Sequence, residues 1–272
     1  MANVRTPLRY PGGKHRVSEM LADNVTPDFK EFREPFVGGG SVFIKLKQKY
    51  PDRKYWINDY YYDLYCFWDQ MQRNPERLVT LVGMMKDKYG GCGYELFEEM
   101  YRGLVTDRGR FDKTWTAVAF FIMNRITFSG TSLSGGYSHR AYNERFTESS
   151  IDRLLDVIPL LDGVKITNED YAVLMDEPGE DVFIYLDPPY YSATKSALYG
   201  SNGDLHVGFD HERFLEACRR CNHKIMITYD DCDYIRDLFK NFNIDTFTNV
   251  YGMRNVTKNG KMHEGELLIK NF

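Results

Sequence analysis

The chain has 272 residues, which is enough for one large domain or for one core domain with an insertion. A hydrophobic fraction of 43% and a formal net charge of −4 indicate a folded globular protein and exclude a histone-like protein that coats any polyanion. Five cysteines at irregular spacing, no apolar signal region and no long apolar run predict a cytoplasmic protein with reduced thiols and no membrane span.

The N-terminal part, residues 1–59, has the pattern of a βαβ unit. A glycine-rich turn at residues 9–14 precedes a short helical stretch. A strand is predicted at residues 31–36, a helix at residues 42–50 and a second strand at residues 54–58. A run of three glycines lies between the first strand and the helix. This order of strand, glycine turn, helix and strand predicts one βαβ unit of a parallel sheet.

Residues 60–161 have a different, helical character. Amphipathic stretches such as residues 76–89 and 114–123 predict helices, and no segment is a convincing strand. The end of this region, residues 128–138, is rich in small residues and predicts a loop or an irregular hairpin. We interpret residues 60–161 as an inserted, mostly helical subdomain.

The α/β pattern returns in the last part of the chain, residues 162–272. The predicted elements are strands at residues 164–167, 181–186 and 224–228, a helix at residues 210–221, and a terminal hairpin formed by residues 243–251 and 265–270. The fold predicted is α/β, with one Rossmann-like domain formed by residues 1–59 and 162–272 and split by the insertion.

The strongest single motif is Asp187-Pro188-Pro189-Tyr190, which directly follows the apolar strand at residues 181–186. Ligands of open α/β sheets bind at the carboxyl ends of strands. Two prolines remove two backbone donors, so the Asp187 carboxylate and the Pro188 carbonyl can accept both N–H groups of an adenine amine. Tyr190 offers a face on which an extruded base can stack. The alternative, evenly weighed on these four residues alone, is a tight proline turn with an exposed acid and a packed tyrosine.

A glycine turn and an acid follow the first two predicted strands. Gly38 and Gly40 begin a dinucleotide-binding pattern, but Phe43 stands where its third glycine belongs. Asp59 follows the second strand, where an acid can hold ribose hydroxyls. S-adenosylmethionine contains an adenosine but no pyrophosphate, so it fits this pattern better than NAD does. Asp170 is either a second acceptor, for the cofactor adenine, or an acid at a helix N-terminus.

Taken in chain order, these motifs resemble those of the Dam-like DNA adenine-N6 methyltransferases, the D12 class with the α order of motifs. The resemblance covers essentially the whole chain and rests on Leu8 to Lys14, Glu34 to Phe43, Asn58-Asp59, Asn124-Arg125, Asp187 to Tyr190 and Gly265 to Leu268. It implies a site-specific enzyme that transfers a methyl group from S-adenosylmethionine to N6 of an adenine flipped out of duplex DNA, without a metal. It also implies that the inserted subdomain recognises the target.

The resemblance assigns residues to each part of such an enzyme. It implies catalytic positions at Asp187, Pro188, Pro189 and Tyr190. It implies a cofactor site at Tyr10, Lys14, Phe36, Gly38, Gly39, Gly40, Ser41, Asp59, Asp170, Tyr171 and Asp187, although Lys14 could instead be a solvated lysine at a helix start. The candidate DNA contacts are Asn124, Arg125, Ser129, Thr131, Ser132, Tyr137, Arg140 and Arg145.

Basic residues supply candidate phosphate contacts. Arg125, Arg140 and Arg145 flank the loop at residues 128–138, and Arg254, Lys258 and Lys261 lie in the predicted terminal hairpin. A solvated basic surface is the alternative. We expect double-stranded DNA as the partner, a cognate restriction endonuclease as a candidate partner, and a monomer.

Several alternatives stay open. Relatives that read GATC have Asn-Gly-Leu-x-Arg where this chain has Ser129 to Leu133, so the recognition sequence is not fixed. Cytosine N4, an RNA adenine or a protein glutamine amide could be the accepting amine, and a DNA-binding protein without catalysis is a different class. Cys218 and Cys221 lack a second ligand pair for zinc and are interpreted as half-buried helix cysteines.

Overall fold

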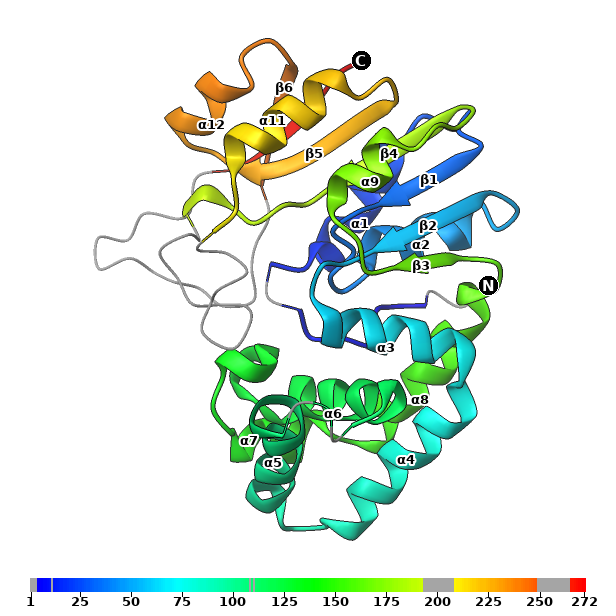
Figure 1. Cartoon of the computed structure of the whole chain (residues 1–272), viewed down its shortest axis with the longest axis vertical. Helices are drawn as coiled ribbons and strands as arrows, with labels where there is room; N and C mark the ends of the chain where they lie inside the picture. Colours follow the sequence, from blue (N-terminus) through cyan, green and yellow to red (C-terminus); the bar gives the residue numbers. More distant parts are fainter. Residues whose placement is uncertain (1–3, 11, 108, 110, 193–207, 249–264) are drawn as a thin grey trace.

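A computed structural model of the chain describes residues 4–10, 12–107, 109, 111–192, 208–248 and 265–272. A seven-stranded sheet with flanking helices forms one part of the molecule, and a group of helices forms a second part below it in the view of Figure 1. The predicted cations Arg254, Lys258 and Lys261 lie outside the described residues.

The sheet has the order β3-β2-β1-β4-β5-β7-β6. Its strands are β1 (Glu31–Glu34), β2 (Lys54–Asn58), β3 (Lys165–Thr167), β4 (Val182–Leu186), β5 (Lys224–Asp230), β6 (Asn243–Phe247) and β7 (Glu266–Lys270). The pairs from β3 to β5 are parallel, and β7 runs antiparallel to both β5 and β6. This confirms the predicted α/β fold with a terminal antiparallel pair. The predicted strand at residues 31–36 ends earlier, at Glu34, before Pro35, which has no backbone donor.

The central strand β4 is buried on both faces. Phe183 and Tyr185 belong to one hydrophobic cluster, and Val182, Ile184 and Leu186 belong to another. This alternation is the period of two expected for a strand, and burial on both faces is typical of a parallel sheet covered by helices. The first face is covered by α1 (Ser18–Asp23) and α2 (Ser41–Lys49), and the second by α9 (Tyr171–Asp176), α11 (His211–Arg220) and α12 (Asp233–Leu238).

The helical part is formed by residues between β2 and β3. It contains α3 (Tyr62–Arg73), α4 (Pro75–Lys88), α5 (Gly93–Tyr101), α6 (Lys113–Ile126), α7 (His139–Arg145) and α8 (Glu148–Val157). Helix α6 lies in the middle and is buried along most of its length, because α3, α4, α5 and α7 all pack against it. The first hydrophobic cluster runs from the sheet into these helices without a break. Among the described helices, none has the length and apolar character required to cross a bilayer.

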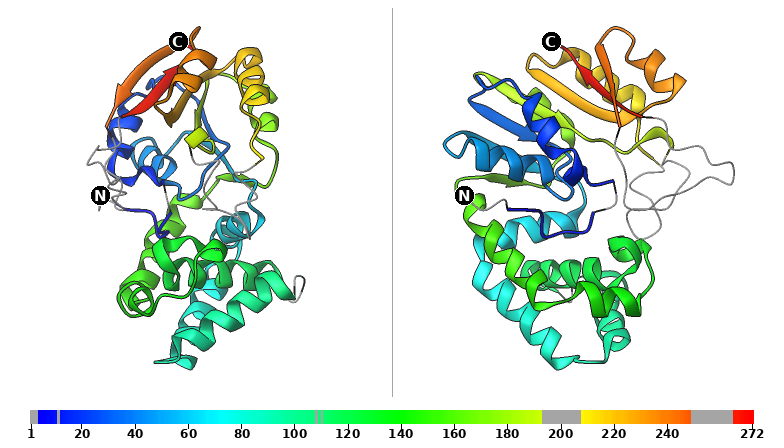
Figure 2. Two further views of the ribbon diagram at one scale, coloured as in Figure 1. Left: turned by 90° about the vertical axis from the view of Figure 1, so that its left-hand side faces the viewer. Right: turned by 180° about the vertical axis from the view of Figure 1, so that it is seen from behind.

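Strands β1 and β4 are neighbours in the sheet although more than a hundred residues separate them in the chain. The order of the strands reverses between them, because β2 and β3 extend the sheet on one side and β5 on the other. Such a reversal creates a crevice at the carboxyl ends of the two strands, where ligands of open α/β sheets bind. The segment at residues 4–10, drawn in dark blue, runs between the sheet and the helical part (Figures 1 and 2).

Candidate active site

Asp187 follows β4, and two side chains hold its carboxylate. Lys14 Nζ donates to both carboxylate oxygens at 2.8 Å, and the Thr228 hydroxyl donates to Oδ1 at 2.7 Å. The Lys14 side chain is 4% exposed, so the alternative of a solvated lysine is wrong, whereas Asp187 is 22% exposed. Burial raises the pKa of Asp187 above its ordinary value, and Lys14 and Thr228 oppose that rise. The carboxylate is therefore paired, oriented and still partly open to solvent.

Tyr190 lies beside this ion pair. Lys14 Nζ is 4.9 Å from the centroid of the Tyr190 ring, a cation–π distance. The Tyr190 hydroxyl donates to the carboxylate of Glu266, and its ring packs against Tyr229 with centroids 5.9 Å apart. These contacts fix the orientation of the ring. The structure thus brings the predicted residues Lys14, Asp187 and Tyr190 into one cluster.

Glu266 reaches the cluster because β7 is antiparallel. Its first residue, Glu266, pairs with Asp230, the last residue of β5, and so lies at the carboxyl edge of the parallel strands. Sequence reasoning assigned no role to Glu266 or to Thr228. Both residues lie in predicted strands, which the sequence did indicate. Only the strand register shows that Thr228 contacts Asp187 and that Glu266 contacts Tyr190.

The chain that follows Asp187 is anchored a few residues later. The backbone N–H groups of Tyr191 and Ser192 donate to the Asp230 carboxylate at 2.9 and 2.8 Å. Pro188 and Pro189, between Asp187 and these residues, have no N–H to donate. Within the described part of the chain no hydrogen bond uses the Pro188 carbonyl. The turn is therefore held at both ends, with an acceptor available in its middle.

Glu34, the last residue of β1, is a further buried acid at this edge. It is 2% exposed, and its Oε2 has no hydrogen-bond partner among the described residues. Burial and the neighbouring Asp187 raise the pKa of Glu34 well above its ordinary value. Sequence reasoning included Glu34 in a motif but not among the site residues. Its position at the end of a central strand was the available signal.

The glycine turn after β1 is packed between two aromatic rings. Gly38 and Gly40 have φ values of +47° and +67°, which favour glycine. A Cβ on Gly38 would lie 2.9 Å from the Tyr10 ring, and one on Gly40 would lie 2.9 Å from the Trp68 ring. A Cβ on Gly39 would lie 3.0 Å from Tyr10 Cβ. The predicted residue Tyr10 therefore lies directly against the turn.

Asp59 follows β2 and holds the same turn. Its carboxylate accepts the backbone N–H of Gly38 and that of Tyr61, both at 3.0 Å. Burial raises the pKa of Asp59 to about 6, and the two N–H groups oppose this rise. Two polar atoms near the ends of β1 and β3 are buried without a hydrogen-bond partner among the described residues, the hydroxyls of Ser41 and Tyr171.

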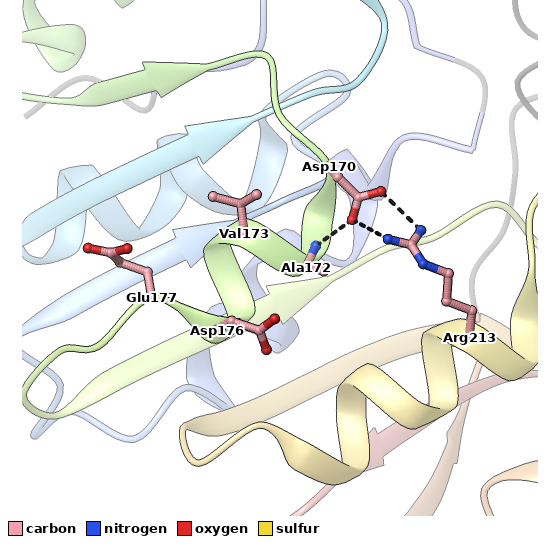
Figure 3. A pocket seen from close by; sticks show the side chains of 6 residues that line it. All are labelled: Asp170, Ala172, Val173, Asp176, Glu177 and Arg213. Carbon is pink, nitrogen blue, oxygen red and sulfur yellow. Dashed lines mark hydrogen bonds and ion pairs between the residues drawn. The ribbon is translucent and has the colours of Figure 1, made fainter.

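Phe36 and Tyr171 join the β1 end to α9. Their ring centroids are 5.4 Å apart. Asp170, next to Tyr171, is the N-cap of α9 and forms a bidentate ion pair with Arg213 at 2.9 and 3.0 Å. These contacts favour the helix N-terminal interpretation of Asp170. Figure 3 shows the pair at a shallow hollow of about 480 Å³, lined by Asp170, Ala172, Val173, Asp176, Glu177 and Arg213.

The insert loop, which we define as residues 127–138, is an irregular hairpin. A single antiparallel bridge joins Thr127 to Tyr137. Ser129 and Ser132 have φ values of +58° and +50°, which are uncommon for residues other than glycine. Phe128 is 66% exposed at this loop, and sequence reasoning did not single it out.

The predicted DNA residues of this region are not all exposed. Asn124 is fully buried, and its amide bonds only to backbone atoms of the chain. Ser132 is buried, and the Thr131 hydroxyl donates to the Phe128 carbonyl. Tyr137 packs among aromatic rings, with Tyr94 at 5.7 Å. Arg140 is exposed and pairs with Glu144.

Four arginines, Arg9, Arg125, Arg145 and Arg153, lie near one another, and none of them forms an ion pair within the described residues. Arg125 is 3% exposed, and its Nε has no partner among the described residues. Burial lowers the pKa of Arg125 to about 9, and the positive charges of Arg153, Arg9 and Arg145 add smaller contributions in the same direction. Like charges at close range are unfavourable unless an anion binds between them. Arg145 was predicted as a DNA residue, whereas Arg9 and Arg153 were not.

The five cysteines are free thiols, and Cys218 and Cys221 are both buried on or next to α11. Within the ranges that the structure describes, no three His, Cys, Asp or Glu side chains cluster as metal ligands do.

Comparison with known proteins accords with this geometry. A family model, the D12 class N6 adenine-specific DNA methyltransferase, matches residues 10–253. The chain belongs to this family. The predicted Rossmann-like fold is the fold of that family. The predicted activity is also confirmed: the chain is an enzyme that methylates adenine in DNA. This decides against cytosine N4 and against a protein without catalysis.

Curated relatives align over nearly the whole chain. The type II methyltransferase M.MjaIII of Methanocaldococcus jannaschii is 25% identical over 99% of this chain and 99% of its own length. The type II methyltransferase M1.LlaDCHI of Lactococcus lactis subsp. cremoris is 25% identical over 99% and 96%. A DNA adenine methylase of Vibrio cholerae is 22% identical over 96% and 92%.

Replacing Lys14 tests the electrostatic role of the ion pair. In Lys14→Met the pKa of Asp187 is expected to rise further, because the cation that lowers it is removed while burial and Glu266 still raise it. The carboxylate then stays protonated to a higher pH, so the acid limb of methyl transfer to DNA shifts to higher pH. The measurement is the rate of tritiated methyl transfer to DNA across pH.

Lys45→Met is the matched control for this variant. Lys45 likewise forms an ion pair, with Glu19, but its side chain is 22% exposed and it lies on α2 rather than at Asp187. Its pH profile should match that of the wild type. An unshifted acid limb in Lys14→Met would show that Lys14 does not set the charge of Asp187.

Proposed function

We propose that this enzyme transfers the methyl group of S-adenosylmethionine to an adenine extruded from duplex DNA, and that Asp187, Pro188 and Tyr190 hold the base. The observation that carries this proposal is the cluster of Lys14, Asp187 and Tyr190 beside the glycine turn. The cluster lies at the reversal of strand order between β1 and β4, where open α/β sheets form the crevice that binds ligands.

The residues around the glycine turn fit S-adenosylmethionine. Buried polar atoms without partners among the described residues, on Glu34, Ser41 and Tyr171, surround the end of β1 and need hydrogen-bonding groups that a polar ligand supplies. The Asp59 carboxylate accepts two backbone N–H groups and retains capacity for a ribose hydroxyl. The proposed cofactor residues are Tyr10, Lys14, Phe36, Gly38, Gly39, Gly40, Ser41, Asp59 and Tyr171. Asp170 and Asp187 belong to this set less directly. When bound, S-adenosylmethionine supplies an electrophilic methyl group.

Asp187 retains one acceptor position for the adenine amine. A carboxylate offers about four lone-pair sites. On Asp187, Lys14 and Thr228 use Oδ1, and Lys14 also uses Oδ2. The remaining position on Oδ2, together with the Pro188 carbonyl, can accept the two N–H groups of the amine. Accepting both bonds draws the lone pair of the nitrogen out of the ring, which makes it a better nucleophile.

Asp187 can also take up the proton that the amine loses on methylation. The carboxylate is in direct contact with that N–H in the proposed complex, and burial raises its pKa, which makes it a better base than an exposed aspartate. Lys14 and Thr228 keep the group ionised and oriented before the reaction. Positioning and fixed polar groups of this kind supply about 7 to 11 kcal/mol when the geometry is good.

Tyr190 provides the stacking surface for the base. Its ring is held by Glu266 and Tyr229, so little rotational freedom is lost when a base packs against it. Stacking of one base on an aromatic side chain is worth about 1 to 3 kcal/mol, which offsets part of the few kcal/mol needed to extrude a base.

The insert loop and the arginine cluster are the proposed DNA-binding surface. Arg145 and Arg153 would bind backbone phosphate, because they are exposed and form no ion pair among the described residues. Arg125 is buried beneath the surface and would add to the positive field at this site. The insert loop itself contains Phe128, Ser129, Thr131 and Tyr137, and Arg140 lies on α7. The recognition sequence depends on this loop. That the helical insertion forms a target-recognition subdomain is part of the proposal.

The names of the archaeal and lactococcal relatives as type II methyltransferases support the expectation of a cognate restriction endonuclease. This partner, a monomeric state and a cytoplasmic location stay predictions.

Replacing Asp187 tests the proposed function. In Asp187→Ala, methyl transfer should fall by at least about a hundredfold, because the amine loses its charged acceptor. Binding of S-adenosylhomocysteine, measured by calorimetry, should weaken far less than methyl transfer does, because Asp187 contributes to the cofactor site only through Lys14. Asp237→Ala, at an exposed acid of α12, is the control and should keep full activity. Near-normal transfer by Asp187→Ala would refute the assignment.

Asp59 is expected to control cofactor affinity. In Asp59→Asn, affinity for S-adenosylhomocysteine should fall by about tenfold or more, since a hydrogen bond to a charged group is worth about 1.5 to 3 kcal/mol. Wild-type affinity should also decrease as the pH falls through about 6, the pKa of Asp59, because the carboxylate becomes protonated. Asp69→Asn, a buried acid of α3, is the control. An unchanged titration in Asp59→Asn would place the cofactor elsewhere.

The arginine cluster is expected to contribute salt-dependent DNA affinity. In Arg145→Ala or Arg153→Ala, binding to duplex DNA should weaken for all sequences, and the slope of log affinity against log salt should decrease by about 1. Arg219→Ala, at an exposed ion-paired arginine of α11, should leave the slope unchanged. Equal slopes for Arg145→Ala, Arg153→Ala and the wild type would show that the cluster does not contact DNA.

A further inference from the structure

We infer that Asn124 is a positioning residue that couples DNA binding at the insert loop to the cofactor site. This inference rests on the proposed function of both sites. It assigns to Asn124 a role different from the direct DNA contact expected from the sequence, because no part of its side chain is exposed.

Asn124 joins two segments that are distant in the sequence. Its Oδ1 accepts the backbone N–H of Arg9 at 2.9 Å, and its Nδ2 donates to the Arg9 carbonyl at 2.8 Å. The same Nδ2 donates to the Gly130 carbonyl at 2.9 Å. One amide thus satisfies both polar groups of the Arg9 backbone and one of the insert loop. Only a side chain with both a donor and an acceptor can make this set of bonds.

The insert loop and Arg9 are also in direct contact. Gly130 has a φ of +76°, and a Cβ on this residue would lie 2.3 Å from the Arg9 carbonyl oxygen. The Arg9 guanidinium donates to the carbonyl of Arg125 at 3.3 Å. The loop therefore cannot shift at Gly130 without moving the Arg9 backbone, and the closeness of this contact explains why a glycine stands there.

Arg9 in turn directly precedes the residues of the candidate cofactor site. Tyr10 packs on Gly38 and Gly39, and Lys14, four residues further on, pairs with Asp187. A displacement of the insert loop is thus carried through one amide and one short backbone segment to the glycine turn. This is a contiguous chain of packed and hydrogen-bonded groups, which is the physical basis for coupling between two sites.

Coupling of this kind has a measurable consequence. If DNA orders the insert loop in the position that Asn124 holds, then the cofactor and the DNA must strengthen each other's binding by the same factor. We expect this factor to be about fivefold or more in the wild type, within the usual range for coupled sites. It should fall to about 1 when the link through Asn124 is broken.

Two variants break the link in different ways. Asn124→Asp keeps an acceptor for the Arg9 N–H but loses the donor to Arg9 and Gly130. Gly130→Ala leaves Asn124 intact but forces the loop away from the Arg9 carbonyl. For each variant, affinity for S-adenosylhomocysteine is measured by calorimetry with and without a duplex DNA fragment that the wild type methylates. Both variants are expected to bind S-adenosylhomocysteine alone within about threefold of the wild type and to lose the coupling factor.

Matched controls separate coupling from a general loss of stability. Thr114→Val removes another buried side-chain hydrogen bond of α6, to Gln70. Gly91→Ala places a side chain on a glycine with a φ of +82° and no atom within 4 Å of the new Cβ. Both controls are expected to lower the melting temperature and to keep the wild-type coupling factor.

The possible results are distinct. Wild-type coupling in folded Asn124→Asp and Gly130→Ala would overturn the inference, as would a wild-type factor of 1. Equal loss of coupling in the two controls would also overturn it, because the effect would then follow stability. Failure of the wild type to bind S-adenosylhomocysteine at all would instead overturn the proposed function.

Discussion

The pairing of Lys14 with Asp187 holds the candidate site together. A buried lysine is unfavourable unless a counter-charge and hydrogen bonds satisfy it, and here Asp187 and the Gly12 carbonyl do so. Lys14 belongs to an N-terminal segment whose described residues contribute no strand to the sheet before β1. The ion pair therefore fastens this segment to the end of β4, and with it Tyr10 over the glycine turn.

The sheet explains why the other polar residues meet this pair. Strands β1, β2, β4 and β5 are parallel, so the acids that end or follow them share one edge: Glu34, Asp59, Asp187 and Asp230. The antiparallel β7 adds Glu266 to the same edge from the opposite chain direction. Burial raises the pKa of Glu34, Asp59 and Asp187, and the buried Lys14 opposes this rise at Glu34 and Asp187. Such a concentration of perturbed acids is typical of functional sites.

The sequence predicted the elements with strong periodicity, and it predicted the motifs at the ends of β1 and β4. It did not predict Thr228 or Glu266, because these residues approach Asp187 and Tyr190 through strand register, which local patterns do not encode. It placed Asn124 on the DNA surface because the resemblance to the Dam-like enzymes rests in part on Asn124-Arg125. Its burial becomes visible only when Arg9 folds against α6, across more than a hundred residues.

The central claim is that the Asp187 carboxylate and the Pro188 carbonyl, at the end of β4, bind the amine of an adenine in DNA. The methyl donor binds at the ends of the neighbouring strands. This claim is tested most directly by incubating unmethylated genomic DNA with the enzyme and S-adenosylmethionine that carries a trideuterated methyl group, followed by nucleoside mass spectrometry. The account predicts trideuteromethyl label on N6 of deoxyadenosine. Label on N4 of deoxycytidine, or no label in DNA, would contradict it.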